Sequence, residues 1–152
     1  MVAVVFVVGM RRKTQWVLDL VRRAGRRMKP LVLRSAGSAG SPTAVVHHVG
    51  RTSGRAYETP VVATPSAGGF VVALPYGEKT DWLQNVLAAG SATIVLDGTT
   101  HDVVAPRVVA MDAVGGAFAA KEQRMHQRFR VVQALEVSSA ARTGSSPAGT
   151  GR

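Results

Sequence analysis

Short apolar runs, rich in valine and separated by glycine, proline and other turn formers, fill the chain from residue 44 to residue 109. Runs of this length and composition predict β-strands, because branched side chains pack well on a pleated surface. Five strands are expected here: Ala44–Val49, Thr59–Thr64, Phe70–Leu74, Ala92–Leu96 and Thr99–Val109. A sixth is expected at Arg130–Val137. The pattern therefore predicts a mainly β, α+β fold built on a small barrel with a few helices.

The connections between these strands carry their own turn signals. Asp97-Gly98 is the strongest short hairpin signal of the chain. The segment Pro65–Gly69 is expected to form a hairpin loop between its two neighbouring strands. Pro106 interrupts the last long run, and it predicts a bulge or a sheet edge because proline cannot donate a ladder hydrogen bond.

Two further segments within this region follow a helical pattern. A short helix is expected to begin after Thr80, as the N-cap, and to end at Gly90. Its apolar stripe contains Trp82, Val86 and Ala89, with Leu83 and Leu87 beside them. A second helix is expected at Ala113–Arg128, weakened by two glycines near its start.

An amphipathic helix with an arginine-rich face is expected at Thr14–Met28, where Pro30 ends it. Residues 1–34 hold nine Lys or Arg against Asp19 alone, whereas residues 35–110 hold four basic and five acidic residues. The net charge of +10 therefore belongs mainly to an N-terminal arm. This arm suits an anionic membrane surface, but packing of its apolar face on the barrel is the favoured interpretation.

The 152 residues fit one domain, which we expect at 35–137, after the basic arm at 1–34 and before a disordered tail at 138–152. Residues 35–42 are expected to form a flexible linker or loop. The absence of cysteine excludes disulfides, thiolate-bound metals and a cysteine nucleophile, and it fits a cytoplasmic location, with association to a membrane left open. Nucleic acid is not an expected partner, because no basic strand is studded with aromatic residues.

The first candidate for chemistry is the segment Gly50–Arg55, which directly follows a predicted strand. Its two glycines allow tight turns, and its amides, hydroxyls and guanidiniums suit a phosphate or a carboxylate. It lacks the ending of a Walker loop. A solvated turn that happens to carry arginines is the alternative interpretation.

The second candidate is Pro75–Trp82, which runs from a strand end into the predicted helix. A helix N-terminus attracts anions, although Asp81 would compete with a ligand there. Trp82 fits the core better than cofactor stacking. Asn85 is expected either to reach a polar ligand group or to cap a loop. His47 and His48 are adjacent and face opposite sides of a strand, so no metal site is expected.

From His48 to Ala89, the two segments together resemble the deazaflavin-dependent nitroreductase family. That family has a Gly-Arg-x-Ser-Gly loop, then Thr-Pro, then a glycine-containing loop and a Trp-x-x-Asn helix. The chain matches in order and spacing with Gly-Arg-Thr-Ser-Gly, Thr-Pro, Pro-Tyr-Gly and Trp-Leu-Gln-Asn. The resemblance implies a split β-barrel, like the FMN-binding proteins, that binds the deazaflavin coenzyme F420.

The same resemblance implies which residues bind the cofactor. The anionic tail or phosphate would be held by Arg51, Thr52, Ser53, Gly54 and Arg55. The deazaflavin ring would lie along Thr59, Pro60 and Val61. The second loop would contribute Pro75, Tyr76, Gly77 and Lys79, fixed by Trp82 and Asn85. No catalytic residue is identified, and Tyr76 is the only candidate. Thr52 departs from the family, since many relatives carry a basic residue there.

The implied function is an F420-dependent oxidoreductase that transfers hydride between the coenzyme and a small or lipophilic acceptor. Two alternatives stay open at this stage. One is a split-barrel oxidoreductase that binds FMN instead. The other is a non-catalytic deazaflavin- or lipid-binding protein whose basic arm associates with membranes. Split barrels often pair, so a homodimer is also left open. In the family that the chain resembles, the members that reduce nitroaromatics use tyrosines late in the chain for the substrate. This chain has only Tyr57 and Tyr76, so the resemblance does not imply nitroaromatic reduction.

Overall fold

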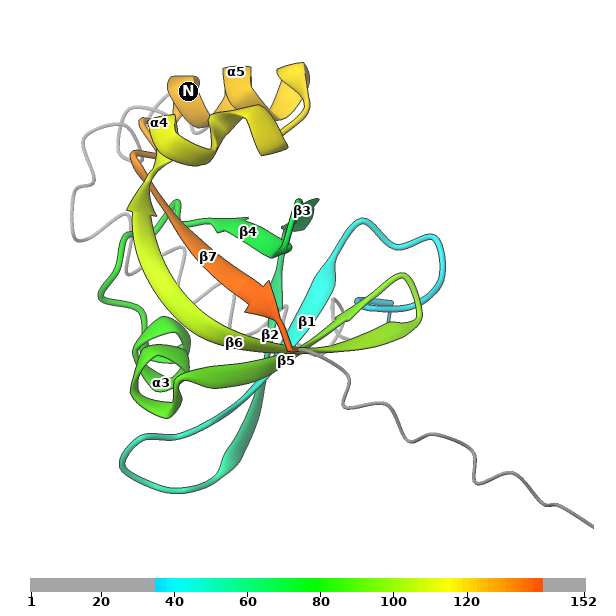
Figure 1. Cartoon of the computed structure of the whole chain (residues 1–152), viewed down its shortest axis with the longest axis vertical. Coiled ribbons are helices and arrows are strands. Elements are labelled where there is room, and N and C mark those ends of the chain that lie inside the picture. Colours follow the sequence, from blue (N-terminus) through cyan, green and yellow to red (C-terminus); the bar gives the residue numbers. More distant parts are fainter. Residues whose placement is uncertain (1–34, 141–152) are drawn as a thin grey trace, which may run out of the picture.

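The computed structural model describes residues 35–140 (Figure 1). Its seven strands are β1 Ala44–Val49, β2 Ala56–Val61, β3 Ala63–Ser66, β4 Gly69–Ala73, β5 Ser91–Leu96, β6 Thr99–Ala110 and β7 Gln133–Ser139. The helices of this part are α3 Asp81–Ala89, α4 Met111–Val114, the 3-10 helix η1 Gly115–Ala117 and α5 Ala120–Arg128. The helix expected at 14–28 and the tail beyond residue 140 lie outside the described residues.

All seven strands form a single antiparallel sheet that curls back on itself. Its order is β2-β1-β5-β6-β7-β4-β3, so the two edge strands are β2 and β3. These two strands are consecutive in sequence, and only Val62 separates them. Because one residue spans roughly 3.5 Å, the two edges of the sheet must meet at this corner. The chain therefore builds the curled half-barrel visible in Figure 1, as the mainly β prediction required.

The predicted turn and the predicted bulge are both confirmed. Asp97 and Gly98 have positive φ values of 50° and 73°, as expected for the two central residues of a type I′ hairpin turn between β5 and β6. In β6 the pairing register with β7 shifts between Val104 and Arg107, and Ala105 has a φ of 52°. This bulge lets one long strand leave β5 and pair with β7.

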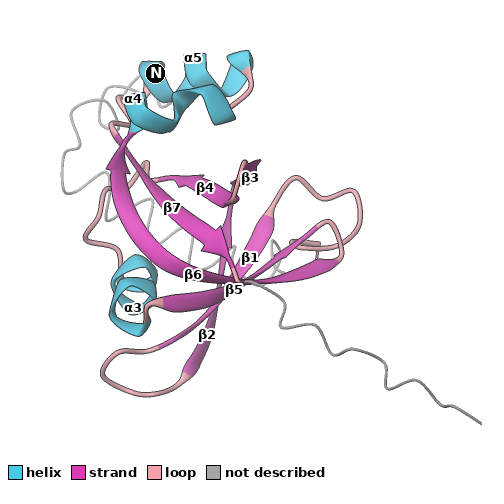
Figure 2. Cartoon of the chain, viewed as in Figure 1, coloured by secondary structure: helices cyan, strands magenta, loops and turns pink. Residues whose placement is uncertain are grey.

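Two apolar clusters fill the two faces of the sheet. The larger lies inside the curl, where Val72 and Ile94 pack against Leu83 and Val86 of α3. The smaller lies under α4, η1 and α5 and consists of Val71, Met111, Phe118, Val131 and Ala134. Successive strand residues point to opposite faces, so β4 and β7 supply side chains to both clusters. Figure 2 shows the helices at the periphery of the strands.

Residues 35–43 form turns that contact the β5–β6 hairpin. The Gly98 amide donates to the Gly37 carbonyl at 2.6 Å, and the Gly40 amide donates to Oδ1 of Asp97 at 2.6 Å. The segment is therefore a loop tied to the barrel. The domain boundaries expected from the sequence stay a prediction.

The prediction of a single strand at Thr59–Thr64 is wrong. This segment contributes to both edges of the sheet, because β2 pairs with β1 while β3 pairs with β4. The chain must change partner at Val62, and that change ends one strand and begins another. The hairpin loop expected at Pro65–Gly69 is also shorter, with only residues 67 and 68 in the turn.

The elements expected near the C-terminus also shift. The helix predicted at Ala113–Arg128 is divided into α4, η1 and α5, because Phe118 adopts extended backbone and enters the smaller cluster. The strand predicted at Arg130–Val137 begins later, since Arg130 has a φ of 51°, and it continues through Ser139. In α3 the buried stripe is Leu83, Asn85 and Val86, whereas Ala89 is exposed.

Candidate functional site

The segment Gly50–Arg55 forms a closed loop between β1 and β2, which we call the 50–55 loop. The Gly50 amide donates to the Arg55 carbonyl at 2.8 Å, and the Gly54 amide donates to the Gly50 carbonyl at 2.9 Å. A Cβ atom at position 50 would lie closer than 3.0 Å to the Ser53 hydroxyl and the Tyr57 ring, so both side chains would have to shift to accommodate it. Within the described part of the chain, the amides of Thr52 and Ser53 donate no hydrogen bond. They are therefore available to an external acceptor.

Arg51 joins this loop to the start of α3. Its guanidinium donates from Nη2 to Oδ1 of Asp81 at 3.1 Å and from Nη1 to Oδ1 of Asn85 at 2.9 Å. The backbone amide of Arg51 donates to the same Asn85 oxygen at 3.1 Å. The Arg51 side chain stays 40% exposed and that of Asp81 89% exposed. Arg51 is thus anchored on one side and open to solvent on the other.

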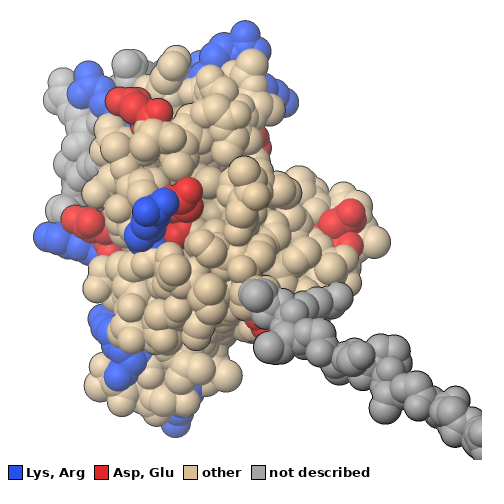
Figure 3. All heavy atoms as spheres, in the orientation of Figure 1, with Lys and Arg blue, Asp and Glu red and all other residues tan. Residues whose placement is uncertain are grey.

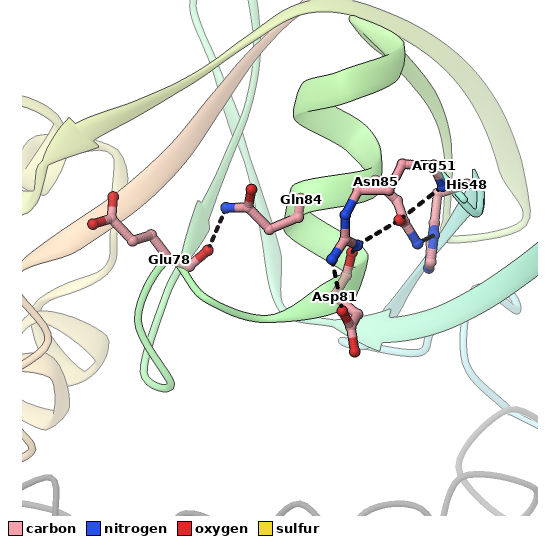
Figure 4. A network of polar contacts seen from close by, with 6 residues as sticks. All are labelled: His48, Arg51, Glu78, Asp81, Gln84 and Asn85. Atoms are coloured by element: carbon pink, nitrogen blue, oxygen red, sulfur yellow. Dashed lines mark hydrogen bonds and ion pairs between the residues drawn. The ribbon is translucent and has the colours of Figure 1, made fainter. Parts of the chain in front are cut away.

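Asn85 continues the network inward (Figure 4). Its Nδ2 lies 3.2 Å from Nδ1 of His48 on β1, and Nε2 of His48 lies 3.0 Å from Oγ1 of Thr59 on β2. His48 and Asn85 are both buried, and the His48 ring stacks on that of Tyr57 at 5.8 Å between centroids. One continuous chain of polar contacts thus runs from the exposed 50–55 loop to the inner face of the sheet.

The Asn85 amide caps the 50–55 loop, one of its two expected roles, while its contact with a ligand stays a prediction. Trp82 is partly buried and packs against the larger cluster, as expected for a core residue. His47 and His48 do face opposite sides, and His47 approaches Glu58 at 3.6 Å on the outer face. Arg55 and Lys79 are exposed.

The second loop, residues 75–80, runs from β4 to α3. The Gly77 amide donates to the Leu74 carbonyl at 3.0 Å, and Gln84 of α3 donates to the Glu78 carbonyl at 2.8 Å, as Figure 4 shows. Desolvation raises the pKa of the Tyr76 phenol above its ordinary value, so it stays protonated at neutral pH. Thr80 occupies the N-cap position but forms no side-chain cap, and its Oγ1 is buried without a partner in the described part.

Residues 59–61 of β2 are half-buried and lie next to the network. Thr59 pairs with Val46 and Val61 pairs with Ala44, so both face the inside of the curl. Pro60 faces outward and sits on an edge strand, where its missing amide removes no ladder hydrogen bond. An apolar ring placed along this edge would meet one hydroxyl and otherwise hydrocarbon.

An open groove of about 730 Å³ lies across β2, β1, β5 and β6. A row of four polar side chains lines this groove on the outer face of the sheet. They are cross-strand neighbours, in the order Glu58, His47, Thr93 and Asp102. It borders the 50–55 loop through Tyr57.

The described part of the chain is electrically balanced, since residues 35–140 hold eight Lys or Arg and eight Asp or Glu. On the face drawn in Figure 3, basic and acidic side chains are both scattered over the surface. A charged ligand would therefore meet local groups such as those of the 50–55 loop. No helix in this part is long and apolar enough to cross a membrane.

The sequence did not single out two members of the network, His48 and Asp81, as site residues. The sequence did contain a signal for His48, because side chains alternate between the two faces along β1, and one of the two adjacent histidines must therefore lie on the inner face beside the loop. Asp81 was read only as a competitor for anions. Its actual partner, Arg51, lies 30 residues away in sequence, and no local pattern predicts that contact.

The family model of the F420H(2)-dependent quinone reductases matches residues 20–136, most of the chain. The chain belongs to this family. It is therefore an F420-dependent oxidoreductase, and the fold class, the cofactor and the family resemblance inferred from the sequence are confirmed. No curated protein matches the sequence significantly.

Two solved structures share the fold of this oxidoreductase. An F420-H2 dependent reductase, FDR-A, superposes with a TM-score of 0.50 at 16% identity, over 64% of this chain and 94% of that one. A structure described as a domain-swapped dimer superposes with a TM-score of 0.52 at 15% identity, over 79% of this chain and 98% of that one.

The donor set of the 50–55 loop fits such a cofactor. F420 carries a phosphodiester and an oligoglutamate tail, so its handle is anionic. The loop offers the amides of Thr52 and Ser53, which donate no hydrogen bond within residues 35–140, beside the guanidiniums of Arg51 and Arg55. Backbone amides and guanidiniums are the groups that proteins use for phosphate and carboxylate.

Proposed function

We propose that this oxidoreductase transfers hydride from reduced F420 to a quinone. The hydride carries two electrons and one proton, and solvent supplies the second proton of the hydroquinone. The coenzyme, now oxidised, returns one proton to solvent, so the reaction balances. The family description supports the quinone as acceptor. Redox chemistry of this kind belongs to the cofactor, so the protein has to bind it, orient it and exclude competing reactions.

The anionic handle binds at the 50–55 loop in this proposal. The observation that supports this site is that the amides of Thr52 and Ser53, next to the anchored Arg51, donate no hydrogen bond among the residues that the structure describes. Gly54, with a φ of 67°, allows the turn that exposes these amides. Arg55 adds a second exposed guanidinium. The loop thus presents donors already fixed in place, which reduces the entropy lost on binding.

The deazaflavin ring lies along Thr59, Pro60 and Val61 of the β2 edge. The second loop, with Pro75, Tyr76, Gly77 and Lys79, flanks it, while Trp82 and Asn85 hold α3 in position. Tyr76 stays a protonated hydrogen-bond donor at neutral pH and is the candidate for a catalytic side chain. The half-buried apolar surface of β2 suits a ring that must be partly shielded from water.

Binding is tested by titrating the full chain with oxidised F420 and, in parallel, with FMN, following the fluorescence of Trp16 and Trp82. We expect saturable binding of F420 and little binding of FMN. Arg51→Ala should weaken F420 binding about ten-fold, because charge-assisted hydrogen bonds contribute more than neutral ones. Arg107→Ala is the matched control, since this exposed arginine is also ion-paired, with Glu136 at 2.6 Å.

Asp81→Asn provides the complementary variant. It removes the carboxylate that pairs with Arg51 and should therefore tighten F420 binding. Turnover is then tested by mixing the protein with reduced F420 and a short-chain naphthoquinone, and recording the return of oxidised-coenzyme absorbance. Tight FMN binding without F420 binding would contradict the proposed hydride transfer from reduced F420. F420 binding without quinone-dependent oxidation would reject the proposed acceptor.

A further inference from the structure

Asn85 is oriented by the two N–H groups that it faces. Both the backbone amide and the guanidinium of Arg51 donate to one Asn85 side-chain atom, at 3.1 and 2.9 Å. That atom must be the carbonyl oxygen, because an amide nitrogen would place hydrogen against hydrogen. The other Asn85 atom, at 3.2 Å from Nδ1 of His48, is therefore the NH2 group.

The orientation of Asn85 fixes the proton on His48. Since the Asn85 NH2 group can only donate, Nδ1 of His48 must accept and carries no proton. A neutral imidazole then has its proton on Nε2, which lies 3.0 Å from Oγ1 of Thr59. This nitrogen donates, and the Thr59 oxygen accepts. His48 is buried, so the surrounding protein, rather than exchanging water, determines this arrangement.

The His48 tautomer in turn determines the orientation of the Thr59 hydroxyl. A hydroxyl that accepts from His48 is free to direct its own hydrogen elsewhere. Thr59 is half-buried on the β2 edge, next to the surface where the proposed function places the deazaflavin ring. A ring carbonyl or ring nitrogen is the acceptor chemistry that this hydrogen suits.

We propose that His48 is a positioning residue: held by Asn85 with its proton on Nε2, it makes the Thr59 hydroxyl a fixed hydrogen-bond donor to the bound heterocycle. This inference rests on the proposed function for the identity of the ligand. The tautomer itself rests only on contacts within the chain. Arg51 takes part at both ends, through the anionic handle and, by way of Asn85, through the ring.

The tautomer is tested first, on the full chain without ligand, by ¹⁵N NMR of histidine-labelled protein. The four histidine signals are assigned by substitution. We expect His48 to show a pyridine-type shift at Nδ1 and a pyrrole-type shift at Nε2. A proton on Nδ1 would overturn the role proposed for His48, whether or not F420 binds.

The coupling is tested by F420 titration of His48→Phe, Thr59→Val and the double variant, after far-UV circular dichroism confirms that each is folded. Each single substitution should weaken binding about five-fold, as expected for one lost hydrogen bond. The double variant should be no weaker than Thr59→Val alone, because His48 acts through that hydroxyl. Thr59→Ser keeps the hydroxyl that Thr59→Val removes, so its affinity for F420 should be close to that of wild type.

His47→Phe is the matched control, since His47 neighbours His48 but lies on the outer face beside Glu58. Its F420 affinity should be unchanged. Additive losses in the double variant would overturn the coupling even if the tautomer is as expected. If the wild-type chain binds no F420, the proposed function fails and the ligand half of this inference falls with it. The tautomer result identifies that case, because it needs no ligand.

Discussion

Asn85→Leu is the substitution that tests most directly whether the buried network stabilises the fold. Asn85 is only 5% exposed, and its side chain forms three hydrogen bonds, two with Arg51 and one with His48. Leucine has a similar volume but no polar atoms. The variant therefore removes the bonds without leaving a large cavity.

The expected loss in the free energy of unfolding depends on whether each former partner of Asn85 can bond to water or to another group instead. Nδ1 of His48 stays buried and loses its donor, which costs about 1–3 kcal/mol. The Arg51 guanidinium is part exposed and keeps Asp81, so water replaces much of its lost contact. With one further neutral bond lost at the Arg51 amide, the free energy of unfolding should fall by about 2–3 kcal/mol.

Gln84→Leu is the matched control on the neighbouring position of α3. Its amide forms one bond, to the Glu78 carbonyl, in an exposed setting, so its loss should cost under about 1 kcal/mol. Urea unfolding followed by circular dichroism measures both variants. If the two lose the same free energy within about 0.5 kcal/mol, the buried network contributes no more than a surface amide, and the reasoning is refuted.

Two further predictions address other parts of the fold. In Gly69→Ala the new methyl group would collide with the Val137 carbonyl, so β4 could not pair with β7, and the free energy of unfolding should fall by more than about 3 kcal/mol. In the control Gly68→Ala the new methyl group contacts no other atom, so the free energy of unfolding should stay within about 1 kcal/mol of the wild-type value. Burial lowers the pKa of His126, with a smaller opposing effect of Glu122, so the unfolded state takes up the proton first as the pH falls. The free energy of unfolding should therefore decrease below about pH 6.5 in wild type and decrease less in His126→Phe, as urea titrations at several pH values would show. If the free energy of unfolding changes equally with pH in wild type and His126→Phe, the lowered pKa of His126 does not cause the loss of stability.

Local signals in the sequence predicted the features that depend on a few adjacent residues. Asp97-Gly98 formed its turn because Asp and Gly tolerate positive φ, and Pro106 coincided with a bulge because it cannot complete a ladder. Gly90 ends α3 with a left-handed φ of 70°. In each case the conformation is determined by interactions among two or three adjacent residues.

Features that depend on partners distant in sequence were missed or mislocated. The apolar run around Val62 looks continuous, yet it divides because its two halves pair with different strands. The helix near the C-terminus breaks because Phe118 has a place in the smaller cluster, which only the folded sheet provides. His48 was missed for the same reason, because the Asn85 amide that it contacts lies 37 residues away in sequence.

Arg51 serves the fold and the proposed ligand with the same side chain, so loss of binding in Arg51→Ala alone does not separate the two roles. Asp81→Asn resolves this, because it too weakens the link between the 50–55 loop and α3 but leaves both bonds to Asn85 in place. If Arg51 only holds the loop, both variants should lose stability and both should lose affinity. If its guanidinium meets an anion, the affinities should move in opposite directions, since Asp81 competes with that anion for the same charge. Whether F420 affinity rises or falls in Asp81→Asn is therefore more informative than how much affinity is lost in Arg51→Ala.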